Sequence, residues 1–229
     1  MEGISAFLDT LKEFWPLLVE STGQTLYMVI AATVIAYVLG TPLGILVVIT
    51  APESIWPHKT VHAVLSWIIN IGRSIPFIIL LVALLPFTRT IVGTTIGATA
   101  TIVPLTIAAT PFVARMIETS LLELDTGVIE MAQAMGANIW QIITKVFLTE
   151  SLPSVIRGFS ITIISLIGYS AMAGAVGGGG LGDLAIRYGY YRYQSDVMIL
   201  TIILLVIIVQ IIQMAGDFAS QKIDKRNIR

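Results

Sequence analysis

The sequence predicts an all-α polytopic membrane protein, and two features of its composition lead to that prediction. Hydrophobic residues make up 56% of the 229 residues and charged residues only 12%, whereas a soluble domain carries about 25% charged residues. The mean hydropathy is +0.90, and a soluble fold of this size could not hide so much apolar surface from water. A soluble enzyme, a disordered chain and a secreted disulfide scaffold are excluded, the last also because the chain has no cysteine.

Five stretches are long enough to cross a membrane as helices. About 20 apolar residues span the hydrocarbon core, and four stretches of at least 20 residues carry no charge. A fifth stretch, residues 60–88, is interrupted only by Arg73. None shows the alternation of a barrel strand, so each is predicted as a helix. The predicted spans cover residues 19–49, 61–87, 95–117, 154–176 and 196–217.

The two ends of the chain lie outside these spans and differ in charge. Residues 1–18 have no signal-peptide pattern, and they form an amphipathic lead-in with one apolar face made of Ile4, Phe7, Leu8 and Leu11. Residues 218–229 are a basic tail. Eight lysines and arginines lie on the side of this tail and four on the opposite side. The positive-inside rule therefore predicts an external N-terminus and a cytoplasmic C-terminus.

The predicted cytoplasmic loop, residues 119–153, contains two short amphipathic helices. Apolar residues follow helical spacing on both sides of Gly136: Val128, Met131, Ala132 and Met135, then Ile139, Ile142, Ile143 and Val146. Asp125 or Thr126 can cap the first helix and Asn138 the second. The loop has four acidic residues and only one basic residue, whereas helices that lie on lipid are rich in lysine and arginine. A protein partner is therefore favoured over a lipid surface.

The spacing in this loop resembles the signature of one transporter family. Glu130-Met131-Ala132, followed by Gly136, Val146 and Leu148, is similar to the EAA signature of the type I, binding-protein-dependent ABC importer permeases. Two positions depart from that signature, because Met131 replaces an alanine and Thr149 a proline. Within that family the chain is most similar to the D,L-methionine importer permeases, in residues 70–77, 168–182 and 188–190. The resemblance extends over residues 20–217.

This resemblance implies a fold, an assembly and a role for the loop. The fold is the type I ABC importer transmembrane domain over residues 19–217, with five helices per subunit. The implied assembly is a homodimer in the cytoplasmic (inner) membrane of a prokaryote, with two ABC ATPase subunits and an extracytoplasmic methionine-binding protein. In that family the loop docks on the ATPase, which implies ATPase-coupling roles for Glu130, Ala132, Met135, Gly136, Ala137, Val146 and Leu148.

The implied function is ATP-driven import of methionine, with two alternatives. The same type of importer could carry another small amino acid or organic solute. A secondary transporter that works without an ATPase is disfavoured, because no acidic residue lies deep in any span and ion-coupled carriers generally use one. The chain has no Walker motif, so ATP and Mg²⁺ are expected on the partner ATPase. No catalytic residue and no cofactor are expected in this chain.

Polar residues within the spans are the candidates for the translocation pathway. Arg73 lies near the middle of the second span, where a charge is costly unless it faces protein or water. It is either a pathway or gate residue that meets a substrate carboxylate, or a brace that bonds carbonyls freed near Pro76 or the partner subunit. The candidates for the pathway or gate are Asn70, Arg73, Ser74, Tyr169, Ser170 and Met172.

Three local motifs favour structural roles over binding sites. Residues 177–182 fit Gly-x-Gly-x-x-Gly, but a membrane span precedes them instead of the strand that a dinucleotide site requires. His58 and His62 have the spacing of a zinc-protease helix but lack its glutamate and a third ligand, so no metal site is predicted. Gly40 and Gly44 are spaced for close helix packing in lipid.

Overall fold

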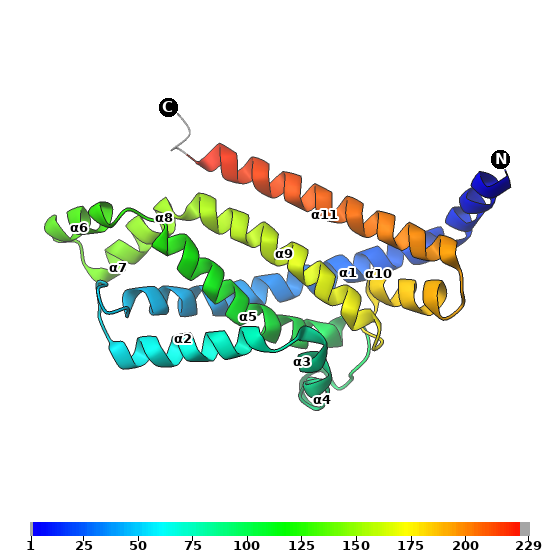
Figure 1. Cartoon of the computed structure of the whole chain (residues 1–229), viewed down its shortest axis with the longest axis horizontal. Coiled ribbons are helices and arrows are strands. Elements are labelled where there is room, and N and C mark those ends of the chain that lie inside the picture. Colours follow the sequence, from blue (N-terminus) through cyan, green and yellow to red (C-terminus); the bar gives the residue numbers. More distant parts are fainter. Residues whose placement is uncertain (1, 225–229) are drawn as a thin grey trace. The chain divides into compact units, whose positions relative to one another are not determined.

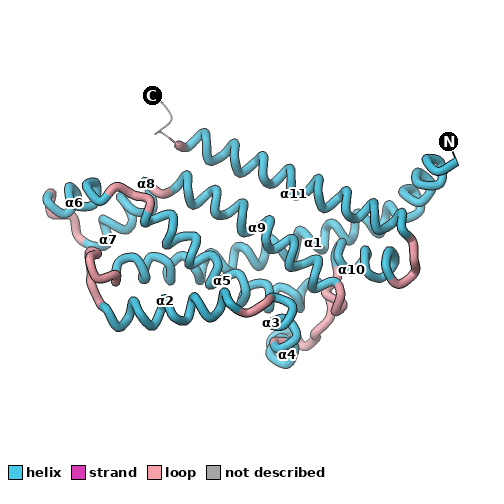
Figure 2. Tube along the Cα trace, in the orientation of Figure 1, coloured by secondary structure: helices cyan, strands magenta, loops and turns pink. Residues whose placement is uncertain are grey.

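The computed structural model describes residues 2–224, and within this range the chain consists of helices and their connections, without strands (Figures 1 and 2). The all-helical fold class is confirmed. The elements are α1 (Glu2–Ile49), α2 (Lys59–Ser74), α3 (Phe77–Ala83), α4 (Leu85–Val92), α5 (Ala98–Leu122), α6 (Thr126–Ala134), α7 (Ile139–Gln141), the π-helix η1 (Ile142–Phe147), α8 (Leu148–Glu150), α9 (Leu152–Gly174), α10 (Gly180–Leu184), the π-helix η2 (Ala185–Tyr190) and α11 (Ser195–Ile223).

The chain forms two compact units that alternate along the sequence. Among the described residues, the first unit comprises 2–34, 76–107 and 163–212, and the second comprises 35–75, 108–162 and 213–224. The four long helices α1, α5, α9 and α11 each contribute residues to both units. These four helices are long and apolar enough to cross a membrane.

The first helix is longer than the predicted span, because the lead-in over residues 1–18 is continuous with it. α1 runs from Glu2 to Ile49 without a break. The predicted apolar face continues into the core of the first unit, which contains Phe14, Leu18, Leu181, Leu184, Val197 and Leu200, with Phe7 and Leu11 packed against it. Leu8 is exposed, and the side chain of Ile4 lies outside the described part of the chain. From Phe7 on, the lead-in is therefore a part of α1 that packs against this core through one face.

The predicted helix over residues 61–87 is interrupted. α2 ends at Ser74, Ile75 has extended backbone with φ −83° and ψ 122°, and α3 starts at Phe77. Pro76 causes the break, because its ring disfavours helical backbone at the preceding residue and it has no N–H to donate. α2 and α3 together remain long and apolar enough to form a broken span or a re-entrant segment.

The second unit depends on close packing between α1 and α5. A Cβ atom on Gly40 would lie 2.8 Å from the carbonyl oxygen of Thr110, and one on Gly44 would lie 2.5 Å from that of Ala114. The packing role predicted for these two glycines is confirmed. α2 completes this core through a buried cluster of Val47, Ile69 and Ala114.

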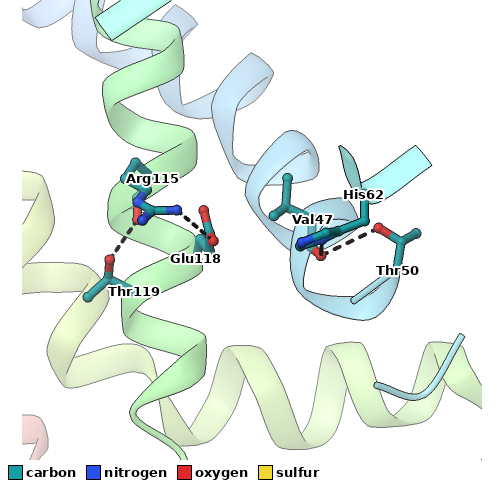
Figure 3. A network of polar contacts seen from close by, with 6 residues as sticks. All are labelled: Val47, Thr50, His62, Arg115, Glu118 and Thr119. Atoms are coloured by element: carbon teal, nitrogen blue, oxygen red, sulfur yellow. Dashed lines mark hydrogen bonds and ion pairs between the residues drawn. The ribbon is translucent and has the colours of Figure 1, made fainter. Parts of the chain in front are cut away.

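A polar contact joins the start of α2 to the end of α1 in the same unit (Figure 3). His62 Nδ1 lies 3.0 Å from the carbonyl oxygen of Val47, and the Thr50 hydroxyl donates to the carbonyl of Leu46 at 2.6 Å. His62 thus holds two helices together, which agrees with the structural role predicted for it. On α5, Arg115 forms an ion pair with Glu118 at 2.8 Å, and the Thr119 hydroxyl donates to the Arg115 carbonyl.

The last helix extends past the predicted span end at residue 217. α11 continues to Ile223, and the first residues of the predicted basic tail are therefore helical. The rest of that tail, residues 225–229, lies outside the described part of the chain.

The orientation of the chain stays a prediction, and cysteine labelling tests it. The chain has no cysteine of its own, and Gln194 and Gln133 are both exposed. In intact spheroplasts, we expect an impermeant maleimide to label Gln194→Cys and to label Gln133→Cys only after the membrane is opened, because the positive-inside rule places Gln133 in the cytoplasm. The reverse labelling pattern would overturn the predicted orientation.

Candidate functional site

The loop between α5 and α9 folds as two short helical segments joined at Gly136, as predicted. The Asp125 carboxylate caps α6 by accepting from the Gly127 N–H at 2.8 Å. Asn138 and Gln141 form a capping box at the start of α7, each side chain accepting from the backbone N–H of the other at 2.9 Å. Gly136 has φ +80°, a left-handed backbone that favours glycine. Local contacts therefore define both helix ends at this turn.

The second helical segment contains a π-helix that the spacing did not predict, η1 over Ile142–Phe147. Of the predicted apolar face, Ile142 and Ile143 are buried and Val146 is half-buried. Phe147, 1% exposed, is buried beside them. α6 packs against η1, and Ala132 is buried.

The loop also exposes large apolar side chains. Met131, Met135 and Trp140 are 56%, 75% and 72% exposed. Ala137 and Trp140 line an open groove together with Ile55, Gln133, Asn138, Ile139 and Ile142. An apolar surface displayed on a capped, ordered loop is typical of a protein-docking surface.

The seven coupling candidates are therefore divided between surface and interior. Glu130, Met135 and Gly136 are exposed, and Ala132 is buried. Ala137, Val146 and Leu148 are half-buried. Glu130 forms no ion pair or hydrogen bond with any residue in 2–224, so its carboxylate is available to a partner.

A polar clamp at the base of the loop was not predicted from the sequence. Arg157, near the start of α9, donates through Nε to the Ser220 hydroxyl at 2.9 Å and lies 3.5 Å from the Asp224 carboxylate. The Ser220 hydroxyl donates to the Pro153 carbonyl at 3.0 Å. These bonds fasten the end of α11 to the start of α9, directly after the loop. No local spacing signals these contacts, because they join residues that are 63 and 67 positions apart.

Asn70, Arg73 and Ser74 lie together on the last turn of α2 and are exposed. The Ser74 hydroxyl donates to the Asn70 carbonyl at 2.8 Å. Within residues 2–224, Arg73 makes no ion pair or hydrogen bond, so the predicted brace to carbonyls near Pro76 is not formed.

The other three pathway candidates lie on α9 in the first unit. The Tyr169 ring stacks on Phe77, with 4.6 Å between ring centroids and 5° between planes. Met172 is 48% exposed, whereas Ser170 is buried and its hydroxyl donates to the Ile167 carbonyl at 2.7 Å. Met172 is thus open to the surface, Tyr169 is half-buried, and the Ser170 hydroxyl is bonded within its own helix.

The glycine-rich segment after α9 is a close-packed turn. α9 precedes it, so no strand is present there to support a dinucleotide site. Gly177, Gly179 and Gly180 have positive φ, and a Cβ atom on Gly174 would lie 2.2 Å from the Asp183 nitrogen. These glycines permit packing, as predicted.

Charge-poor helices, a broken helix bearing an arginine, and an ordered loop with exposed apolar side chains are together typical of the membrane component of a transport system. The chain belongs to the family described as the binding-protein-dependent transport system inner membrane component, whose sequence profile matches residues 40–229. It is accordingly a multi-pass protein of the bacterial inner membrane, with the type I ABC importer fold.

Individual relatives are similar over almost the whole chain. A Vibrio cholerae protein named "Probable D-methionine transport system permease protein MetI" is 51% identical over 92% of this chain and 93% of its own length. The methionine import system permease protein MetP of Bacillus subtilis is 45% identical over 94% of this chain and 96% of its own length. An inward-facing structure of the MetNI methionine ABC transporter matches with a TM-score of 0.92 and 48% identity, over 93% of this chain and 99% of that one.

Proposed function

We propose that this chain is the permease subunit of an ATP-driven methionine importer. The observation that carries the proposal is similarity over nearly the full length, at 51% and 45% identity, to permeases of two distant bacteria that are both named for methionine. The pathway candidates fit such a substrate. Arg73 supplies a charge for a carboxylate, and the surrounding apolar spans suit an unbranched thioether chain.

The working importer would contain two copies of this chain, two ATPase subunits and an extracytoplasmic methionine-binding protein. The exposed Met131, Met135 and Trp140 support this assembly, because large apolar side chains exposed together on one loop are typical of a protein interface. Each chain offers one such loop, so two chains would match a pair of ATPases. ATP and Mg²⁺ bind the ATPase, and this chain contributes no catalytic residue.

The loop would convert movement of the ATPase into movement of the spans. Glu130, Met135 and Gly136 contact the ATPase, while Ala132, Val146 and Leu148 hold the two short segments together, and Ala137 lines the groove beside them. The Arg157 clamp then ties the loop to α9 and α11. Packed helices relay a displacement that a flexible loop would absorb.

Uptake into vesicles tests this function. We expect proteoliposomes with the chain, its co-purified ATPase and the matching binding protein to accumulate methionine only when ATP is present, because energy enters through the ATPase. Vesicles that lack the binding protein serve as the control. If methionine fails to compete for uptake while another amino acid or organic solute succeeds, the substrate is different and the importer class stands. Uptake driven by an ion gradient without ATP would indicate a secondary transporter.

A further inference from the structure

The short helix α10 receives its N-terminal cap from α1. α10 begins at Gly180, and its N-cap residue Gly179 has no side chain to offer. The Gly180 N–H donates to Gln24 Oε1 at 2.9 Å, and the Leu181 N–H donates to the Thr25 hydroxyl oxygen at 2.9 Å. Gly180 and Leu181 are buried, so these N–H groups have no access to water. Their bonding therefore depends on two side chains that are 156 residues away along the chain.

The composition of this segment fits the same contact. A Cβ atom on Gly180 would lie 2.5 Å from Thr25 Oγ1, and one on Gly179 would lie 2.9 Å from Gln24 Oε1. Glycine at both positions is what allows α1 to approach. The Gln24 amide nitrogen donates to the Glu20 carboxylate at 3.1 Å, which leaves the Gln24 oxygen directed at the glycine-rich segment.

The same segment is bonded to α5 on its other side. The Gly97 N–H donates to the Gly177 carbonyl at 2.9 Å, and the Thr101 hydroxyl donates to the Gly178 carbonyl at 3.1 Å. Close contact between Gly182 and Ala171 joins the segment to the last turns of α9. Those turns also carry Met172, a pathway candidate.

We infer that Gln24 and Thr25 are positioning residues for transport. They fix α10 and the glycine-rich segment, Gly174–Gly182, and through it hold the end of α9 where Met172 faces the pathway. Without this cap the segment shifts to find other partners for its buried N–H groups, and ATP hydrolysis proceeds with fewer substrate molecules moved. This inference rests on the proposed function.

The helix α1 supplies a matched set of variants for the test. Thr25→Val keeps the shape of the side chain and removes the oxygen that accepts from Leu181, whereas Thr25→Ser keeps that oxygen. Thr22 is the control for Thr25. The Thr22 hydroxyl donates to the Leu18 carbonyl of α1 at 2.7 Å, just as the Thr25 hydroxyl donates to the Ser21 carbonyl of α1 at 3.0 Å. Gln24→Leu removes the other cap independently.

The readout is the number of methionine molecules imported per ATP hydrolysed by the reconstituted complex. This ratio does not depend on how much protein folds. We expect Thr25→Val and Gln24→Leu to lower it about fivefold or more, the consequence of leaving a buried N–H unbonded, with Thr22→Val and Thr25→Ser close to the unmodified complex. An unchanged ratio in Thr25→Val and Gln24→Leu would overturn the inference and leave the cap a purely structural feature. If the unmodified complex imports another solute and not methionine, the proposed substrate is wrong. The positioning role is then tested by the same ratio, measured with that solute.

Discussion

Replacing Gly136 with proline is expected to reduce uptake at least about tenfold while the protein still enters the membrane, since proline is destabilising where its fixed φ does not fit the native backbone. Gly136 has φ +80°, and proline requires a φ near −65°. The Gly136 N–H also donates to the Gln133 carbonyl at 2.9 Å, a bond that proline cannot make. The loop would then present its two short helices at the wrong angle. The measurements are ATP-dependent uptake and the amount of ATPase that co-purifies.

Gly136→Asn is the matched control for this variant. Asparagine adopts the left-handed backbone more readily than other residues with a side chain, and no atom lies within 4 Å of a Cβ placed on Gly136. We therefore expect most of the uptake to be retained. Normal uptake and normal ATPase binding in Gly136→Pro would show that the turn between the two short helices is not part of the coupling element.

Local sequence patterns predicted the loop well because its structure is determined by neighbouring residues. Asp125 and Asn138 cap their helices, and Gly136 makes the turn, each through contacts a few residues away. The π-helix η1 was not predicted, because a periodicity of 3.6 residues cannot reveal a π turn.

The break in the second predicted span has a signal in the sequence, Pro76, but the prediction of a single span followed the hydropathy instead. Apolar residues continue on both sides of Pro76, so a search for charge-free length joins α2 and α3 into one helix. The extended backbone at Ile75 has a local cause, because a proline sterically disfavours helical backbone at the residue before it. Arg73 therefore lies in the last turn of α2, directly before the break.

Contacts between distant residues could not be predicted from one sequence. Neither the Arg157–Ser220–Pro153 clamp nor the bonds from Gln24 and Thr25 to α10 follow from spacing or composition. The glycine-rich segment signalled close packing, but the sequence did not say against what. The exposed surface of the loop could be predicted because it is formed by residues close together in the sequence. The side chains that contact α9 and α10 from distant parts of the chain could not be predicted in this way.

The largest loss of stability is expected from Gly44→Leu in α1. A Cβ atom on Gly44 would lie 2.5 Å from the Ala114 carbonyl oxygen and 2.8 Å from the Ile117 Cβ atom, and neither is the flexible end of a side chain. α1 and α5 would have to separate in the second unit. Overpacking typically costs about 1–3 kcal/mol, and leucine, which adds three further carbon atoms, should exceed about 3 kcal/mol.

Gly23→Leu in the same helix is the control for Gly44→Leu. A Cβ atom on Gly23 has no neighbour within 4 Å, and leucine has the higher helix propensity, by less than about 1 kcal/mol. Heating the detergent-solubilised protein and following the folded fraction by size-exclusion chromatography should show a markedly lower midpoint for Gly44→Leu, with Gly23→Leu at or above the unmodified chain. Equal midpoints for both variants would contradict this prediction, because they would mean that α1 and α5 can separate at Gly44 without a loss of stability. Because α5 leads directly into the loop, Gly44→Leu should also reduce the amount of ATPase that co-purifies, whereas Gly23→Leu should not.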